Sequence, residues 1–490
     1  MKLNFEKYRD KVNACWIGKN IGGTMGGPYE GKREILDVKG FTSEPGEPLP
    51  NDDLDLQLVW LHAMERVGAQ ALNASVLADY WEQLITPHWN EYGIGKANAR
   101  RGLLPPLSGD YNNNWKHSNG AWIRTEIWAC LCPANPAAAV KYAVEDAMVD
   151  HGTGEGTVAA AFVAAMQSAA FTVDSIDDAI KVGLAAIPED SRMAKSVRLV
   201  YECREKGMSP VEARNAVQQA NADIGDGWFE APSNVAYSII GLLYGEGDFK
   251  KSMILAVNCG DDTDCTAATV GATLGILGGM KAIPEDWQEY IGDRIITVSI
   301  AMGIVGGRLP KTCTELTERV VALAPSVLKA QFRGNVRIGT GADEIPDNVV
   351  EKYINDPCLR EPLTRLVPNS VIVDDLFMTV TVMYGDTPEI APFEEKKLKI
   401  RFRNKAGFEC NFGLSSPHNL TLRWLGCDGF TVIGQTAVAL IHKTSHHTGE
   451  VEIDVTVRAG ETVASVNRLV LEIVNEGKAQ ITYVPITLLG

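Results

Sequence analysis

The feature that most constrains this chain is a cluster of three carboxylates placed directly before a long apolar segment. Asp261, Asp262 and Asp264 lie within four positions, and residues 266–280 are almost all small or apolar. If that segment is a buried helix, the acids lie at its N-terminus, where the helix dipole favours negative charge. The dipole alone cannot offset three buried carboxylates, because unpaired buried charge is very costly. The pattern favours a hard divalent cation with oxygen ligands, and a solvated acidic cap is the alternative.

The same segment carries a stripe of glycines. Gly271, Gly275 and Gly279 recur every four residues, so on a helix they would form one smooth face. Such a face lowers the intrinsic helix propensity but lets a neighbouring helix approach closely. The stripe therefore predicts a helix that is packed tightly against a partner.

A second acidic cluster opens another predicted helix. Asn51, Asp52, Asp53 and Asp55 follow Pro50, and Pro and Asn are plausible residues for a helix boundary. Apolar residues continue at helical spacing, at Leu54, Leu58, Leu61 and Met64. Two acidic helix starts in one chain can converge on a single site. Carboxylates from both would suit a pair of cations that share ligands, hold a substrate and activate water.

Composition excludes some classes of partner. The net charge is −16, which argues against general nucleic-acid binding because that binding depends on basic surfaces. The N-terminus lacks a signal-peptide core. The longest apolar stretches, 156–171 and 266–280, are shorter than the ~20 residues that span a bilayer. We expect a cytoplasmic, non-membrane protein whose ten cysteines are reduced and mostly packed as small hydrophobes.

The periodicity changes along the chain. Residues 1–335 have the pattern of helices, residues 336–368 are polar and contain prolines, and residues 369–490 alternate with a period of two. We therefore predict a multidomain protein: an all-α domain over 1–335, a linker over 336–368 and a small all-β sandwich over 369–490. Two roles stay open for the sandwich, saccharide binding or contact with a second copy in a homo-oligomer.

Between the predicted helices, residues 87–120 are rich in aromatic and amide side chains. We predict a long loop here, and its aromatic residues argue against disorder. Trp115 lies in this stretch, next to Asn112, Asn113 and Asn114. Aromatic faces beside amides suit a sugar or a base, while simple packing of the loop is the alternative.

Six short motifs occur in order along the helical part of the chain. They are GGTMGGPYE at Gly22–Glu30, NDD at Asn51–Asp53, SNGAWIR at Ser118–Arg124, HGTGE at His151–Glu155, GDDTDC at Gly260–Cys265, and Ile283–Pro284 with Trp287. With these motifs in this order, the chain resembles the ADP-ribosylglycohydrolase family over roughly residues 12–300. The C-terminal sandwich lies outside the resemblance.

The resemblance implies an all-α bundle that holds two Mg²⁺ or Mn²⁺ ions. The metal ligands implied by position come from both acidic clusters: Asn51, Asp52, Asp53, Asp262, Asp264 and Cys265. The ions would bind ribose hydroxyls and a water molecule, and cleavage would occur at the anomeric carbon of a ribofuranoside. Glu30 would act on the water or orient the sugar, with Asp53 and Asp262 beside it in catalytic roles.

The implied substrate is a small-molecule glycoside or an ADP-ribose conjugate, with no nucleic acid and no membrane involved. The candidate substrate-binding residues come from three stretches of the chain: Trp115, Ser118, Asn119, Gly120, Trp122 and His151. For Trp122 a structural role is the alternative, and for His151 a position at a helix end.

Four positions depart from the family pattern. Asn51 and Cys265 stand where the family has threonine, Gly23 where many members have aspartate, and Asp261 where they have glycine. An amide oxygen still binds a hard cation, but a thiol is a poor ligand for Mg²⁺. The departures widen the expected substrates to related N- or O-glycosides. A non-catalytic crystallin-like protein or a nucleotide-binding regulatory protein is the alternative, and retention of the metal carboxylates favours the hydrolase.

Overall fold

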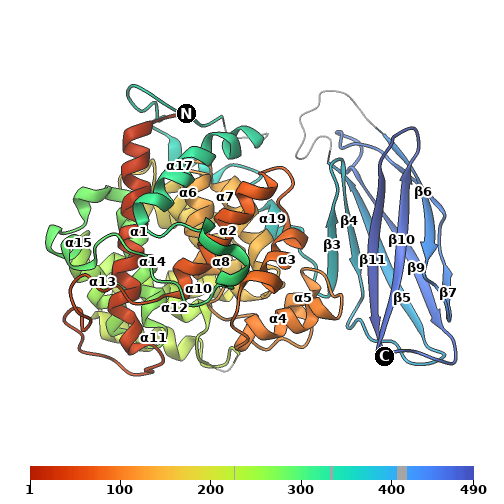
Figure 1. The fold of residues 1–490 in the computed structure, drawn as a ribbon, viewed down its shortest axis with the longest axis horizontal. Helices are drawn as coiled ribbons and strands as arrows, with labels where there is room; N and C mark the ends of the chain where they lie inside the picture. The colour runs from red at the N-terminus through yellow and green to blue at the C-terminus, as the bar shows by residue number, and fades with distance from the viewer. Residues whose placement is uncertain (226, 332–334, 406–416) are drawn as a thin grey trace. The chain divides into compact units, whose positions relative to one another are not determined.

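The computed structural model describes residues 1–225, 227–331, 335–405 and 417–490. The chain divides into two compact units (Figure 1). The first contains Met1–Gly93, Asn114–Ala147 and Thr153–Arg365, and the second contains Ile94–Asn113, Met148–Gly152 and Leu366–Gly490. The domain boundaries that we placed at residues 335 and 369 from the sequence remain predictions.

The first unit is almost wholly helical. Its α-helices are α1 (Phe5–Gly26), α2 (Asp52–Val67), α3 (Ala74–Leu84), α6 (Glu126–Leu131), α7 (Pro136–Ala147), α8 (Glu155–Ala169), α9 (Ile176–Ala186), α10 (Arg192–Glu205), α11 (Pro210–Ala220), α12 (Ala231–Tyr244), α13 (Phe249–Asn258), α14 (Thr263–Gly278), α15 (Glu285–Ile291), α16 (Met302–Val305), α17 (Cys313–Ala330), α18 (Val349–Ile354) and α19 (Glu361–Thr364). Short 3₁₀ turns are η1 (Gly27–Tyr29), η2 (Trp122–Arg124), η3 (Met280–Ala282) and η4 (Gly306–Arg308). Strands β1 (Lys2–Asn4) and β2 (Arg337–Gly339) form a short parallel pair.

Helices α1 and α14 pack against each other through their backbones (Figure 1). A Cβ on Gly271 would lie 2.1 Å from the carbonyl oxygen of Gly18, and a Cβ on Gly275 would lie 2.3 Å from that of Ala14. Only glycine allows so close an approach of two backbones. The predicted contact of the glycine stripe is therefore confirmed at these two positions, whereas Gly279 caps the end of α14 with a φ of 72°.

Helix α2 begins at the second acidic cluster. The Asn51 side chain caps it, because its Oδ1 accepts a hydrogen bond from the Asp53 backbone N–H at 2.8 Å. Further along the helix, Trp60 stacks with Trp81 and Trp128, with ring centroids 6.1 Å and 6.5 Å apart. This buried aromatic contact anchors α2 and so holds its acidic N-terminus in one position.

The long loop that we predicted over residues 87–120 is wrong in part. The stretch contains α4 (Asn90–Arg100), which runs from the first unit into the second, and α5 (Leu107–Asp110). Gly93 in α4 lowers the intrinsic helix propensity and concealed the helix in the sequence. In the fold a Cβ on Gly95 of the same helix would lie 3.1 Å from the Cβ of Asp150, so close packing against a distant part of the chain overrides propensity here.

The second unit is built on two antiparallel sheets, with strand orders β11-β10-β6-β8 and β3-β4-β5-β9-β7. The strands are β3 (Ser370–Asp374), β4 (Met378–Met383), β5 (Glu395–Asn404), β6 (His418–Leu425), β7 (Phe430–Ile433), β8 (Ala437–Leu440), β9 (Glu450–Ala459), β10 (Val466–Asn475) and β11 (Ile481–Leu489). Burial alternates along β5, where Leu398 and Ile400 are buried and Lys397 and Lys399 are exposed.

Apolar residues of both sheets share one core, which also includes Leu103 and Leu107. The predicted order, a helical region followed by an all-β region, is thereby confirmed. Within the described residues, every helix is too short or too polar to cross a membrane.

Candidate metal centre and active site

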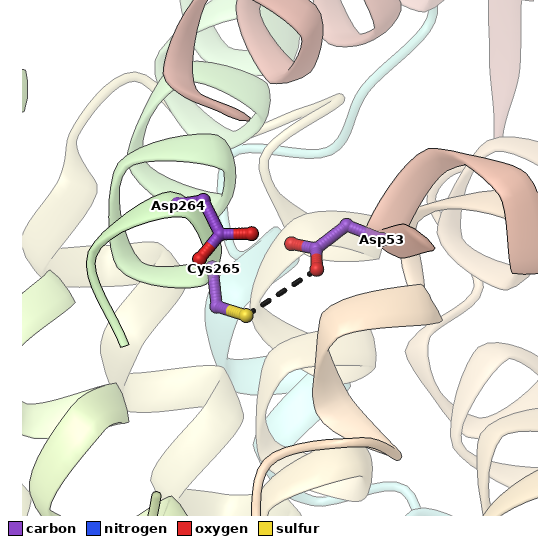
Figure 2. A group of neighbouring side chains, drawn as sticks. All are labelled: Asp53, Asp264 and Cys265. Carbon is purple, nitrogen blue, oxygen red and sulfur yellow. Dashed lines mark hydrogen bonds between the residues drawn. The ribbon is translucent and has the colours of Figure 1, made fainter. Parts of the chain in front are cut away.

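The starts of α2 and α14 bring together carboxylates that are distant in the sequence (Figure 2). Asp53 of α2 faces Asp264 and Cys265 of α14, and one ligand atom from each lies within 4.8 Å of the others. Carboxylate oxygens of Glu30, Asp262 and Asp264 form a second group within the same limit. Because the two groups share Asp264, all of these side chains belong to one acidic cluster.

A turn in an unusual backbone conformation leads into α14. Gly260 has a φ of 74° and Asp261 a φ of 69°, in a region that favours glycine. The Asp261 carboxylate accepts hydrogen bonds from Asn234 Nδ2 at 3.1 Å and from the Phe229 backbone N–H at 3.3 Å. These bonds stabilise the turn with an aspartate in place of glycine, and Asp262 takes the N-cap position of α14 without a capping hydrogen bond from its side chain.

Glu30 reaches the cluster from the loop after α1. The backbone N–H of Gly31 donates to the Asp261 carbonyl oxygen at 2.9 Å, and Lys32 forms a β-bridge with Asp261. These contacts tie the loop to the turn before α14. Glu30 is exposed to solvent and Asp52 is half-buried, whereas Asp53, Asp262 and Asp264 are buried. The cluster therefore has one accessible carboxylate next to several buried ones.

Within the acidic cluster, three buried carboxylate oxygens have no hydrogen-bond partner among the described residues: Asp53 Oδ2, Asp262 Oδ1 and Asp264 Oδ1. Each of these residues exposes 6% or less of its surface. A buried polar group without a partner costs about 1–3 kcal/mol, and a charged one costs more. Hard, negatively charged oxygen donors that lack partners fit a divalent cation such as Mg²⁺ or Mn²⁺.

The acids also raise one another's pKa values. The charge of Asp264, burial and then Asp52 raise the pKa of Glu30 to about 8. Burial and then Asp264 raise the pKa of Asp52 to about 6, although the Tyr92 hydroxyl donates to Asp52 Oδ2 at 3.0 Å and lowers it. Burial, followed by Asp264, raises the pKa of Asp262 well above its usual value. Without a metal the cluster resists full ionisation near neutral pH, and a bound cation would favour the ionised form.

A buried lysine lies beside Asp53. Lys19 Nζ is 3.6 Å from Asp53 Oδ2 and 3.1 Å from Glu126 Oε2, and none of the three side chains is exposed. The amine also donates to the Ile123 carbonyl oxygen at 2.8 Å. Burial alone would lower the pKa of Lys19, but Glu126 and Asp53 together raise it above its usual value. Lys19 is therefore a permanent positive charge next to the cluster.

The two positions where threonine is replaced both contact Asp53. The Cys265 thiol donates to Asp53 Oδ1 at 3.3 Å (Figure 2), and burial, then Asp262, raises the pKa of the thiol well above its usual value. Asn51 Oδ1 is the cap of α2, and its Nδ2 would lie 1.9 Å from a Cβ on Gly23. The Asn51 amide thus occupies the space that a side chain at position 23 would need. The roles of Asn51 and Cys265 as metal ligands remain predictions.

Asn119 lies at the cluster. Its Nδ2 donates to Asp262 Oδ2 at 2.6 Å, and its Oδ1 accepts from Trp122 Nε1 at 2.9 Å. Trp122 is fully buried, and the hydrogen bond from its indole N–H to Asn119 is a contact within the protein. Gly120 lets the Glu91 side chain approach the backbone closely, because a Cβ at position 120 would lie 2.3 Å from Glu91 Oε1. This segment orients one of the acids through the Asn119 amide.

The remaining predicted substrate-binding residues have different surroundings. Trp115 is half-buried, and its carbonyl oxygen accepts from the backbone N–H of the buried Ser118 at 3.0 Å. His151 folds with the second unit, where it is fully buried and its Nδ1 lies 2.9 Å from Asp150 Oδ1. For all of these residues a role in substrate binding remains a prediction.

Three residues that support the cluster were not expected from the sequence: Lys19, Tyr92 and Asn234. Lys19 did carry a signal, because it is a charged residue within an apolar, glycine-rich helix, and a lysine is buried only with a partner. Tyr92 and Asn234 carried none, since their partners Asp52 and Asp261 are distant in the sequence.

Comparison with known proteins bears on what this site does. Residues 4–323 match the family model for ADP-ribosylglycohydrolase. An uncharacterized protein of Archaeoglobus fulgidus is 26% identical over 310 residues, which cover 59% of this chain and 92% of that protein. ADP-ribosylhydrolase ARH3 of Homo sapiens is 22% identical over 323 residues, which cover 57% of this chain and 88% of that protein.

A solved structure described as an ADP-ribosylglycohydrolase-related protein complex is 21% identical, covers 66% of this chain and 99% of its own, and superposes with a TM-score of 0.42. The family match is the stronger finding, because it spans well over half of this chain and includes both acidic helix starts. The chain therefore belongs to the ADP-ribosylglycohydrolase family and is a hydrolase that acts on glycosyl bonds.

Proposed function

We propose that this enzyme hydrolyses the bond at the anomeric carbon of an ADP-ribose conjugate, or of a related ribofuranoside, at a centre for two Mg²⁺ or Mn²⁺ ions. The observation that carries the proposal is the set of buried carboxylate oxygens at the starts of α2 and α14 that lack hydrogen-bond partners among the described residues. Lys19 pairs with Asp53 alone among these acids, and the buried negative charge that remains is rarely kept without a functional reason.

Residues of both helix starts would hold the ions: Asn51, Asp52, Asp53, Asp262, Asp264 and Cys265. When bound, such ions bind sugar hydroxyls and lower the pKa of a water molecule. Helix N-termini suit the task because their backbones are rigid and their side chains are fixed by caps and packing. Asn119 supports the site by orienting Asp262, and Tyr92 does the same for Asp52.

Glu30 is the residue to which we assign the proton transfer. One of its carboxylate oxygens would accept a proton from the attacking water as the water oxygen bonds to the anomeric carbon. The bond from that carbon to the leaving group breaks, and the leaving group departs with the electron pair and takes up a proton. A general base must lie within reach of the proton that it takes up, and Glu30 is the exposed carboxylate of the group that it forms with Asp262 and Asp264.

An ADP-ribose conjugate is the substrate that two observations favour. The name of the human relative describes that protein as an ADP-ribosylhydrolase. In this chain Lys32 and Arg33 lie two and three residues after Glu30 and are exposed. The Arg33 guanidinium carbon lies 3.4 Å from the ring centroid of Trp228. A cation with an aromatic face beside a catalytic carboxylate suits a ligand that carries both a diphosphate and a base.

The proposal is tested by incubating the full chain with peptides that carry ADP-ribose through an oxygen or a nitrogen link. We expect release of free ADP-ribose in Mg²⁺ and no release in EDTA. Glu30→Gln should lower kcat by about 100-fold or more, whereas Glu34→Gln, which changes another exposed carboxylate of the same loop, should not. A metal-loaded protein that releases nothing from these conjugates or from simple ribosides would overturn the proposal.

A further inference from the structure

We propose that the two halves of this metal centre are unequal: the half formed by Glu30, Asp262 and Asp264 binds an ion tightly, and the half formed by Asp53 and Cys265 binds one weakly. The cause is Lys19, a resident cation that already compensates the charge of Asp53. This inference rests on the proposed metal centre and describes how its two positions differ.

Lys19 is held in place by a closed set of contacts. Its Nζ donates to the Ile123 carbonyl oxygen at 2.8 Å and pairs with Glu126 Oε2 at 3.1 Å. The two Glu126 oxygens are held in turn by Gln57 Nε2 at 2.9 Å and by Gln167 Nε2 at 3.0 Å. All of these side chains are fully buried. The ammonium group therefore cannot move out to solvent, and it stays 3.6 Å from Asp53 Oδ2.

The other oxygen of Asp53 is also engaged. Asp53 Oδ1 accepts the thiol proton of Cys265 at 3.3 Å (Figure 2). A divalent ion bound to Asp53 Oδ2 would be repelled by the positive charge of Lys19. An ion bound to Asp53 Oδ1 would have to displace the hydrogen bond from the Cys265 thiol. Sulfur is also a poor donor for Mg²⁺ or Mn²⁺, which prefer oxygen.

In the other half of the cluster, Asn119 Nδ2 donates to Asp262 Oδ2 at 2.6 Å, but the second oxygen of this carboxylate is not engaged by any described residue. Asp262 Oδ1 and Asp264 Oδ1 lack hydrogen-bond partners among the described residues. No lysine or arginine in the described ranges forms an ion pair with either aspartate. Glu30, the third carboxylate of this group, is exposed and gives an ion a route of entry. The first ion therefore binds to Glu30, Asp262 and Asp264. A second ion beside Asp53 is repelled both by that ion and by Lys19.

Titration of the metal-free full chain with Mn²⁺, with free Mn²⁺ followed by electron paramagnetic resonance, tests this inference. The wild type should show two classes of site whose dissociation constants differ by about 30-fold or more. Cys265→Thr supplies an oxygen donor and should tighten the weak class by about tenfold, with the tight class unchanged. Lys19→Met should also lower the dissociation constant of the weak class, because it removes the positive charge that competes with the ion for Asp53.

Matched controls exist on the same helix and among the buried thiols. Lys11→Met removes another lysine of α1, which donates to the carbonyl oxygens of Ala170 and Phe171, and Cys313→Ser changes a fully buried thiol at the start of α17. Neither should alter the ratio of the two constants. If Lys19→Met does not fold, Lys19→Gln, which removes the charge but keeps a hydrogen-bond donor for the Ile123 carbonyl oxygen, takes its place beside Cys265→Thr.

The possible outcomes separate this inference from the proposed function. Absence of any Mn²⁺ binding to the wild type would overturn the metal centre itself. Two wild-type sites of equal affinity, or a ratio that Cys265→Thr leaves unchanged, would overturn the inequality and leave the proposed hydrolysis standing.

Discussion

The acidic cluster of the first unit and the β5–β9 pair of the second hold charge in opposite ways. In the cluster, Asp53, Asp262 and Asp264 are buried; Lys19 pairs with Asp53, while Asp262 and Asp264 each have one oxygen without a hydrogen-bond partner among the described residues. On the strands, Arg458 pairs with Glu395 while their side chains stay 54% and 48% exposed. Exposed ion pairs are solvated in the folded and unfolded chain, so they contribute little. Buried like charges oppose folding, so their presence indicates a ligand that compensates them.

The largest expected effect comes from breaking the helix contact on which the cluster is built. Gly271→Ala would place a methyl group 2.1 Å from the Gly18 carbonyl oxygen. We expect it to lower the free energy of unfolding by about 3 kcal/mol or more. Urea denaturation followed by tryptophan fluorescence measures this, since every tryptophan except Trp424 precedes residue 300. Gly40→Ala is the control, because its Cβ would meet nothing within 4 Å; equal stability of the two variants would contradict the packing argument.

Removing one buried charge should separate activity from stability. Asp262→Asn keeps the shape of the side chain but loses a proposed metal ligand, so kcat should fall by about 100-fold or more. The metal-free protein should become more stable by about 1 kcal/mol, because one of the mutually repelling carboxylates is gone. Asp454→Asn in the second unit, where the side chain is 89% exposed, should change neither quantity. A loss of stability in metal-free Asp262→Asn would contradict the comparison.

The pH dependence of stability should also reveal the cluster. A carboxyl whose pKa is raised in the folded state contributes stability that is full below its unfolded pKa and is lost as pH rises through its folded pKa. Glu30 and Asp52 have pKa values raised to about 8 and about 6. In EDTA the melting temperature should therefore fall between about pH 5 and pH 8.5, by on the order of 3 °C.

Saturating Mg²⁺ should abolish this fall, because it binds the ionised carboxylates of the folded chain. Differential scanning fluorimetry across the pH range, with EDTA and with Mg²⁺, makes the comparison. A melting temperature in EDTA that rises over this window would show that the acids are not mutually repelling in the folded protein.

The smallest effect is expected at the exposed pair of the second unit. A double-mutant cycle of Arg458→Ala and Glu395→Ala should give a coupling free energy of about 0.5 kcal/mol, falling with added salt. Chemical denaturation of the four proteins measures it. A coupling above about 2 kcal/mol would mean that exposure is a poor guide to the energetic weight of charges in this molecule.

Much of the helical architecture could be predicted because its signals are local. Two helix starts are indicated by the acids at Asp52 and Asp262, and a close helix contact is indicated by Gly271 and Gly275. Each signal lies within a few residues of sequence. The alternation that predicts β5, β9 and β10 is local as well. Fold class and the two acidic helix starts therefore followed from periodicity and composition.

The rest depended on contacts between distant residues. The sequence gives no reason for Lys19 to pair with Glu126 and Asp53, or for Tyr92 to reach Asp52. Helix α4 was missed because its glycine lowers the local propensity while packing favours the helix. Residues 94–113 and 148–152 belong to the second unit, and Leu103, Leu107 and Tyr111 lie in the apolar core of its strands, a pairing that no local pattern could reveal.

The most direct test of the central claim is anomalous diffraction from crystals of the full chain soaked with Mn²⁺. We expect a strong anomalous peak for an ion that is ligated by Asp262 and Asp264, next to Glu30. A weaker peak should appear beside Asp53 at higher Mn²⁺ concentration. Absence of a peak between the starts of α2 and α14 in a saturated crystal would contradict the claim that these buried carboxylates form a metal centre.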